Sequence, residues 1–157
     1  FSKSVWSQNY AAYNHFFLNP YLYNPAEVAS TQGFVFFNHR MQWNGIEGSP
    51  QLSTVNFNTL IDESYTGIGA KISNYSRGIL RTTDVSLTYA HGIGIGKNDA
   101  LFFGLSGGLI TNSIDLTQLT DDDLDDPVIA SYLANNLQPT SSFGMVYKSE
   151  SGLNFGV

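Results

Sequence analysis

The sequence predicts an all-β fold, a transmembrane antiparallel β-barrel of which these 157 residues supply the N-terminal part with about seven strands. Three observations favour this class. Short segments alternate apolar and polar residues, only 13% of residues are charged against about 25% in typical soluble proteins, and no apolar run approaches the roughly 18 residues of a spanning helix. Because lipid-facing and interior-facing residues alternate in such barrels, the mean hydropathy of -0.11 agrees with this interpretation.

The chain divides into two regions. Residues 1–32 are expected to form an irregular or partly helical lead-in, because they contain two dipeptides that favour turns, Asn19-Pro20 and Asn24-Pro25. Residues 33–157 are expected to form the strands. Seven segments there show the two-residue period of strands, at 34–43, 52–61, 67–75, 83–95, 100–110, 143–148 and 153–157.

The alternation separates two faces on each segment. In the first segment one face carries Val35, Phe37, His39, Met41 and Trp43, and the other carries Phe34, Phe36, Asn38, Arg40 and Gln42.

The fourth and fifth segments form the clearest hairpin, joined through 96–99, and a tight turn is expected at Asp62-Glu63-Ser64. The fifth segment sets an apolar face against a mostly small one that includes Gly104, Ser106 and Gly108. Glycines on an interior face let neighbouring backbone or side chains approach closely.

A barrel in lipid must close, so seven strands imply that the full barrel needs more chain. A first residue other than Met suggests a mature, exported chain. The net charge of -6 argues against nucleic acid as a partner, because phosphate binding needs clustered Lys and Arg.

No catalytic, metal or cofactor-binding residue is predicted. The three histidines, His15, His39 and His91, show no metal-ligand spacing. The acidic run Asp121, Asp122, Asp123, Asp125 and Asp126 lacks the calcium-loop spacing and is interpreted as a solvated loop. The glycine-rich stretch 92–97 lacks the spacing of a phosphate-binding loop and lies on a strand pattern.

Two blocks of sequence carry a resemblance to a known family. The string from Phe17 to Ala26, with Asn19-Pro20 and Asn24-Pro25-Ala26, resembles the opening of PorP/SprF family proteins. The string from Arg40 to Pro50, which contains Gln42-Trp43, Gly45 and Gly48, is similar to that family's segment at the end of the first strand. Later stretches agree, so the resemblance covers nearly the whole chain; the dense acidic run at 120–126 departs from it.

This resemblance implies an outer-membrane barrel of the Bacteroidota type IX secretion and gliding apparatus, and not an enzyme. The implied partners are outer-membrane lipid, other secretion and gliding components including periplasmic proteins, and the C-terminal region of secreted adhesins. The implied role is to support the export or surface attachment of particular adhesins.

The residues of both blocks are the candidate structural or partner-binding residues: Asn19, Pro20, Asn24, Pro25, Arg40, Gln42, Trp43, Gly45, Gly48 and Pro50. The Asn-Pro turns either dock a periplasmic partner or fold the lead-in into the barrel. Arg40, Gln42 and Trp43 form either a corner in which Arg40 hydrogen-bonds loop carbonyls or a carboxylate inside the lumen, or a stabilising contact between the barrel and its plug. Aromatic side chains of the lead-in, including Tyr21 and Tyr23, either anchor at the membrane interface or pack on the barrel wall.

Two other functions remain open from the sequence alone. A soluble or surface β-sandwich that binds a ligand through its aromatic residues would also alternate. A passive diffusion channel would line its water-filled interior with Asn38, Arg40, Lys71 and Asp84.

Overall fold

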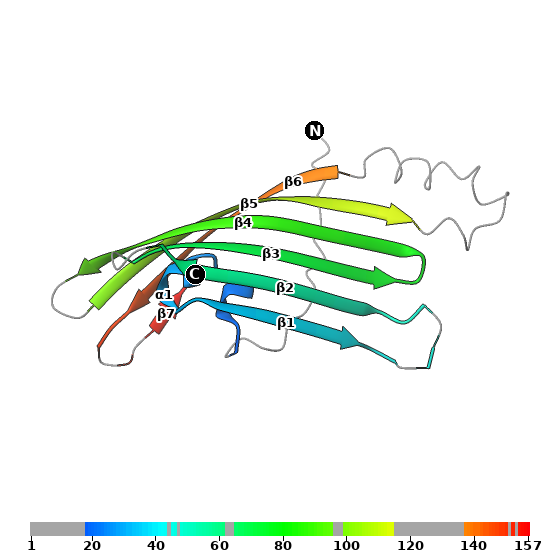
Figure 1. Cartoon of the computed structure of the whole chain (residues 1–157), viewed down its shortest axis with the longest axis horizontal. Coiled ribbons are helices and arrows are strands. Elements are labelled where there is room, and N and C mark those ends of the chain that lie inside the picture. The colour runs from blue at the N-terminus through cyan, green and yellow to red at the C-terminus, as the bar shows by residue number, and fades with distance from the viewer. Residues whose placement is uncertain are drawn as a thin grey trace, which may run out of the picture.

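The computed structural model contains one antiparallel sheet of seven strands, which curls into a half-barrel (Figure 1). The structure describes residues 18–43, 45–46, 48–61, 65–95, 99–114, 137–150, 152 and 154–157. Each strand pairs with its neighbours in sequence, so the order runs from β1 to β7 without a crossover. The described elements are η1 (Pro20–Leu22), α1 (Glu27–Ser30), β1 (Phe34–Met41), β2 (Gln51–Leu60), β3 (Thr66–Arg77), β4 (Leu80–Ile95), β5 (Asp99–Ile114), β6 (Leu137–Lys148) and β7 (Asn154–Gly156).

All seven predicted strands are present, but several of their limits were wrong. β1 ends at Met41, so Trp43 lies beyond the strand with a positive φ of 55°. β6 begins at Leu137 instead of 143, because its ladder with β5 continues through Pro139, which pairs with Leu109. β4 and β5 each run for 16 residues, since their polar ends keep pairing where the apolar alternation has stopped.

The polarity of the two faces of the sheet is the reverse of that in a soluble protein. The convex face exposes large apolar side chains from neighbouring strands: Val35, Phe37, Val55, Phe57, Ile68, Ile72, Val85, Leu87, Tyr89, Leu105, Leu109 and Phe143. The concave face buries polar side chains: Thr54, Asn56, Asn58, Ser73, Ser86, Thr88 and Ser106. Apolar residues outside and polar residues inside are the arrangement of a membrane β-barrel.

This arrangement does not fit the β-sandwich. A sandwich buries its apolar strand faces between two sheets, whereas the described strands form one sheet whose apolar face stays exposed. The longer strands, β2 to β6, have 10 to 16 residues, enough for the roughly 9–11 residues with which a tilted strand crosses a bilayer.

In the part of the chain that the structure describes, helical structure is confined to two short turns, η1 and α1. Among the described residues, none of the helices has the length and apolar character needed to cross a membrane. Several sequence-based expectations fall on residues outside the described ranges: the turn at 62–64, the acidic run at 120–126, His15 and most of the lead-in aromatics.

Candidate functional site

Residues 19–31, called the inner segment below, lie on the concave face of the half-barrel. α1 contacts β2, β3, β4 and β5. The local sequence explains the path: Pro20 opens the 3-10 turn η1, where its fixed φ is favourable. The Asn24 side chain then accepts a hydrogen bond from the backbone N–H of Ala26 at 2.9 Å, the turn geometry typical of asparagine.

Four glycines of the wall make room for the inner segment. A Cβ at Gly67 would stand 2.7 Å from the Val28 carbonyl oxygen, and a Cβ at Gly69 would stand 2.9 Å from the Tyr21 ring. A Cβ at Gly104 or Gly144 would also come under 3.0 Å, against Pro25 and Ala26 or against Asn24. We call Gly67, Gly69, Gly104 and Gly144 the glycine seat. The expectation that interior glycines permit close approach is confirmed here.

A small apolar cluster forms where the inner segment meets the wall. Its buried members are Tyr21, Ala26, Val28, Ala29, Ala90, Phe102 and Val146. Three of these, on β4, β5 and β6, come from the wall, and the rest come from the inner segment. This cluster is the apolar core of the described structure, so the inner segment supplies much of that core.

Polar side chains at the start of the inner segment bond to β2 and β4. Asn19 donates through Nδ2 to Oδ1 of Asn56 at 2.6 Å, and both side chains are buried. The Tyr21 hydroxyl shares a hydrogen bond of 2.8 Å with Thr88 Oγ1. Thr88 in turn bonds Ser106 at 2.6 Å. The proposal that Tyr21 anchors at the membrane interface is therefore wrong, because this side chain packs on the inner wall.

The second Asn-Pro turn reaches the last hairpin. Asn24 Nδ2 donates to the carbonyl oxygens of Met145 and Val157, each at 3.1 Å. One side chain thus bridges β6 and the residue that follows β7. Pro25 is buried, and its carbonyl group lies against Gly104.

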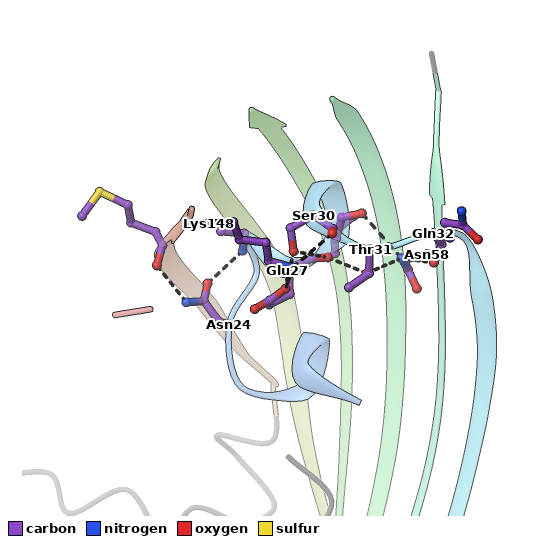
Figure 2. Close-up of polar contacts among 10 residues, drawn as sticks. Asn24, Glu27, Ser30, Thr31, Gln32, Asn58 and Lys148 are labelled. Atoms are coloured by element: carbon purple, nitrogen blue, oxygen red, sulfur yellow. Dashed lines mark hydrogen bonds and ion pairs between the residues drawn. The ribbon is translucent and has the colours of Figure 1, made fainter. Parts of the chain in front are cut away.

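An ion pair joins the end of the inner segment to β6 (Figure 2). Lys148 Nζ lies 3.2 Å from Glu27 Oε2 and also donates to the Ser30 carbonyl oxygen at 3.1 Å. Glu27 accepts a further short hydrogen bond from the Ser30 hydroxyl. The side chains of Lys148 and Glu27 are 30% and 14% exposed, so the pair is only partly shielded from water.

Asn58 holds the exit from α1 on the opposite side (Figure 2). Its Nδ2 lies 3.3 Å from Thr31 Oγ1 and 3.5 Å from the carbonyl oxygens of Val28 and Gln32. Thr31 also donates to the Glu27 carbonyl oxygen at 2.7 Å. These contacts steer the chain from α1 into β1.

The second candidate block forms a turn at the far end of β1 and β2. Three of its described residues have positive φ: Trp43 at 55°, Gly45 at 98° and Gly48 at 73°. The Gln42 N–H donates to the Pro50 carbonyl oxygen at 3.0 Å, and the Gly78 N–H donates to the Gly48 carbonyl oxygen at 2.9 Å. The second bond ties this turn to the β3–β4 turn.

Arg40 and Gln42 lie together beside this turn. With the Gln42 amide oxygen oriented toward Arg40, it accepts from the guanidinium at 2.7 and 3.2 Å. Trp43 is 68% exposed. The structure therefore separates the candidates into two groups, the Asn-Pro residues on the concave face and the residues 40–50 at one end of the strands.

Sequence reasoning missed the wall residues that receive the inner segment. Lys148, Asn56, Asn58 and Thr88 sit in ordinary strand alternation, and only the apolar contacts and register of the fold bring them under residues 19–31. Within the described ranges no group of three or more acidic or histidine side chains could hold a metal ion.

The comparisons with known proteins agree with the fold. A family model described as "Type IX secretion system membrane protein PorP/SprF" matches residues 5–157. Neither a curated protein nor a solved structure matches the chain. Because the family match spans almost the whole sequence, the chain belongs to the PorP/SprF family of type IX secretion system membrane proteins.

Proposed function

We propose that this chain is part of a non-enzymatic outer-membrane β-barrel that supports the export or surface attachment of specific adhesins in a type IX secretion and gliding machinery. Membership of the family makes it a type IX secretion component. The adhesin role, the gliding role and the outer membrane as location are the proposed steps.

One observation carries the membrane assignment: the exposed apolar convex face. Phe37, Val55, Ile72, Val85 and Leu109 align across β1 to β5 in successive paired positions, and each side chain is 44% to 66% exposed. Such a continuous apolar surface is unfavourable in water. Outer-membrane lipid is its proposed partner, since a β-sheet crosses a bilayer only as a barrel.

The remaining partners are assigned to the two groups of candidate residues. The turn at 40–50, which exposes Trp43 and Ile46, is proposed to meet the C-terminal region of an adhesin. The end of the barrel with the inner segment is proposed to meet periplasmic components of the machinery. No catalytic role is proposed, because the family is described as a secretion system membrane protein.

A passive channel is the weaker candidate. Asn38, Arg40, Lys71 and Asp84 do lie on the concave side of the register. However, residues 19–31 cover the concave face over β2 to β5, and their buried contacts oppose an open water-filled lumen.

The test measures both where the protein is located and which adhesins reach the cell surface. Cells that carry the intact gene, a deletion, or Leu87→Lys are separated into outer-membrane, inner-membrane and soluble fractions, and their surface proteins are quantified by mass spectrometry. The proposal expects the protein in the outer membrane and the loss of a few adhesins from the surface in the deletion strain. Recovery of the protein in the soluble fraction, or an unchanged surface proteome in the deletion strain, contradicts it.

A matched control separates assembly from cargo choice. Thr83→Lys introduces the same charge on the same strand, four positions earlier and beyond the apolar rows. This variant is expected to keep both the outer-membrane location and the adhesins. Loss of every type IX cargo in the deletion strain, and not only a few adhesins, would assign the chain to the general export step instead.

A further inference from the structure

The convex side of the sheet has a band without charged side chains. Strand alternation places the odd-numbered residues of β4, from Arg81 to Ile95, on this side, together with the residues that pair with them on β3 and β5. Within the described strands, the convex positions carry an Asp, Glu, Lys or Arg side chain only at Arg81 and Asp99. These two residues lie at opposite ends of the β4–β5 hairpin, so the uncharged band lies between them.

On the side of the β4–β5 turn, this band ends at different heights on successive strands. We define its border by the last register pairs in which both side chains are large and apolar or aromatic. These pairs are Val35–Phe57 on β1 and β2, Ile68–Tyr89 on β3 and β4, Ile93–Leu101 on β4 and β5, Leu101–Tyr147 on β5 and β6, and Tyr147–Phe155 on β6 and β7. The border therefore moves toward the β4–β5 turn from β1 to β7.

The inclination of this border follows from the register. The row of paired residues that starts at Val35 and Phe57 continues through Leu87 and reaches β6 at Ser141. Tyr147 lies six positions beyond Ser141 on the same strand. Six residues extend about 20 Å along a strand and five strand spacings about 24 Å across a sheet, so the border is inclined by about 40° to the rows. Because strands of outer-membrane barrels tilt by about 35–45°, a level lipid boundary cuts the rows at the same angle.

Aromatic side chains mark the border. Phe57, Tyr89 and Phe155 are 42%, 55% and 64% exposed. The Tyr147 hydroxyl donates to Oδ2 of Asp99 at 2.9 Å, so its polar end meets the first charged residue beyond the band. Aromatic rings with a polar tip favour the level of the lipid headgroups, and aromatic girdles flank the apolar band of membrane barrels.

We propose that the edge of the bilayer hydrocarbon on this side follows the oblique line from Val35 and Phe57 to Tyr147 and Phe155, so that the strands are inclined by about 40° to the membrane normal. The aromatic side chains of this line lie among the lipid headgroups. This inference rests on the proposed function for the presence of a membrane. It adds the orientation of the sheet in that membrane, because lipid contact alone is equally compatible with upright strands and a boundary parallel to the rows.

The test uses the absence of cysteine from the sequence. Single-cysteine variants of the full-length protein are folded into phosphatidylcholine vesicles and labelled with a nitroxide. The collision rates of the nitroxide with oxygen, which concentrates in hydrocarbon, and with a water-soluble nickel chelate are then measured, and their ratio reports depth. Leu87→Cys, at a position 68% exposed on the convex face, is the hydrocarbon reference. Glu150→Cys, at an exposed position after β6, is the water reference.

Thr59→Cys on β2 and Phe143→Cys on β6 form the decisive pair, because both positions lie on one row of the register. Thr59 lies beyond the border at Phe57, whereas Phe143 lies inside the border at Tyr147. We expect the oxygen-to-nickel ratio of Phe143→Cys to rise to the hydrocarbon reference and that of Thr59→Cys to fall toward the water reference.

A second pair keeps the test decisive should a variant of the first pair fail to fold. Thr66→Cys on β3 and Met145→Cys on β6 share the next row, and Met145→Cys is expected to have the higher ratio. Equal ratios within the pairs, or higher ratios at the threonine positions, overturn the oblique boundary. If Leu87→Cys keeps a ratio far above that of Glu150→Cys in that case, lipid contact and the proposed function stand. A ratio at Leu87→Cys equal to that of Glu150→Cys contradicts lipid contact itself and overturns both.

Discussion

Asn24 Nδ2 lies 3.1 Å from the carbonyl oxygen of Met145 and at the same distance from that of Val157. The same side chain accepts from the Ala26 N–H through its oxygen. An asparagine is well suited to this position, because only a short amide offers two donors and an acceptor together. The inner segment is thereby tied to the last hairpin of the described sheet.

Replacing Asn24 is expected to weaken this tie. Asn24→Ala removes all three hydrogen bonds, and we expect a loss of about 1–3 kcal/mol in the free energy of unfolding. Denaturant titration of the purified protein in detergent, followed by tryptophan fluorescence, measures this loss. Asn74→Ala is the control, because it removes one exposed bond to Thr83 on the convex face; an equal effect of the two substitutions would contradict the role of Asn24.

The glycine seat gives a sharper comparison within one strand. Gly104→Ala places a methyl group against the backbone of Pro25 and Ala26, while Gly107→Ala, three positions later on β5, meets nothing within 4 Å. Overpacking of this kind costs about 1–3 kcal/mol. We therefore expect Gly104→Ala to lower the denaturation midpoint and Gly107→Ala to leave it unchanged. Similar midpoints for the two variants would show that the inner segment does not rest on Gly104.

The seven strands could be predicted because their alternation is a local pattern. Val85, Leu87 and Tyr89 share a face with period two whatever else the chain does. The start of β6 could not be predicted in this way, since Leu137, Pro139 and Ser141 on one face lack a common character. There the ladder with β5 decides the structure, and a ladder is a contact between distant residues.

Only the inner-segment part of the candidate site could be predicted from the sequence, and the wall residues that contact it could not. The Asn-Pro dipeptides are visible in the sequence because proline and asparagine fix local backbone geometry. Their receivers, such as Thr88 for Tyr21 and Asn56 for Asn19, are 67 and 37 positions away. No local pattern links residues so far apart, whereas small residues at 104, 106 and 108 did indicate that something approaches that face.

A substitution on the convex face tests whether this face contacts lipid or water. Leu87 is 68% exposed and lies between Ala70 and Gly107 in the register. A lysine on the lipid face of a barrel costs roughly 2–4 kcal/mol near the bilayer midplane, whereas a lysine on a water-exposed face costs little. We expect Leu87→Lys to lower folding into lipid vesicles strongly and Thr83→Lys to lower it weakly. Folding yields that match for both variants would indicate that this face does not contact lipid.

The connections between strands predict which end of the barrel faces the cell exterior. At one end the chain needs residues 42–50 and 115–136 to join β1 to β2 and β5 to β6. At the other end, residues 61–65, 96–98 and 149–153 suffice. Outer-membrane barrels have short periplasmic turns and longer extracellular loops, so the turn that carries Ile46 is expected outside and the turn that carries Glu150 inside.

Ile46→Cys and Glu150→Cys, both at exposed positions, are treated in intact cells with a maleimide too large to cross the outer membrane. We expect labelling of Ile46→Cys in intact cells and of Glu150→Cys only after lysis, because the membrane shields the periplasmic end. The reverse pattern would invert the barrel and would move the inner segment, which enters β1 from the short-turn end, to the cell surface.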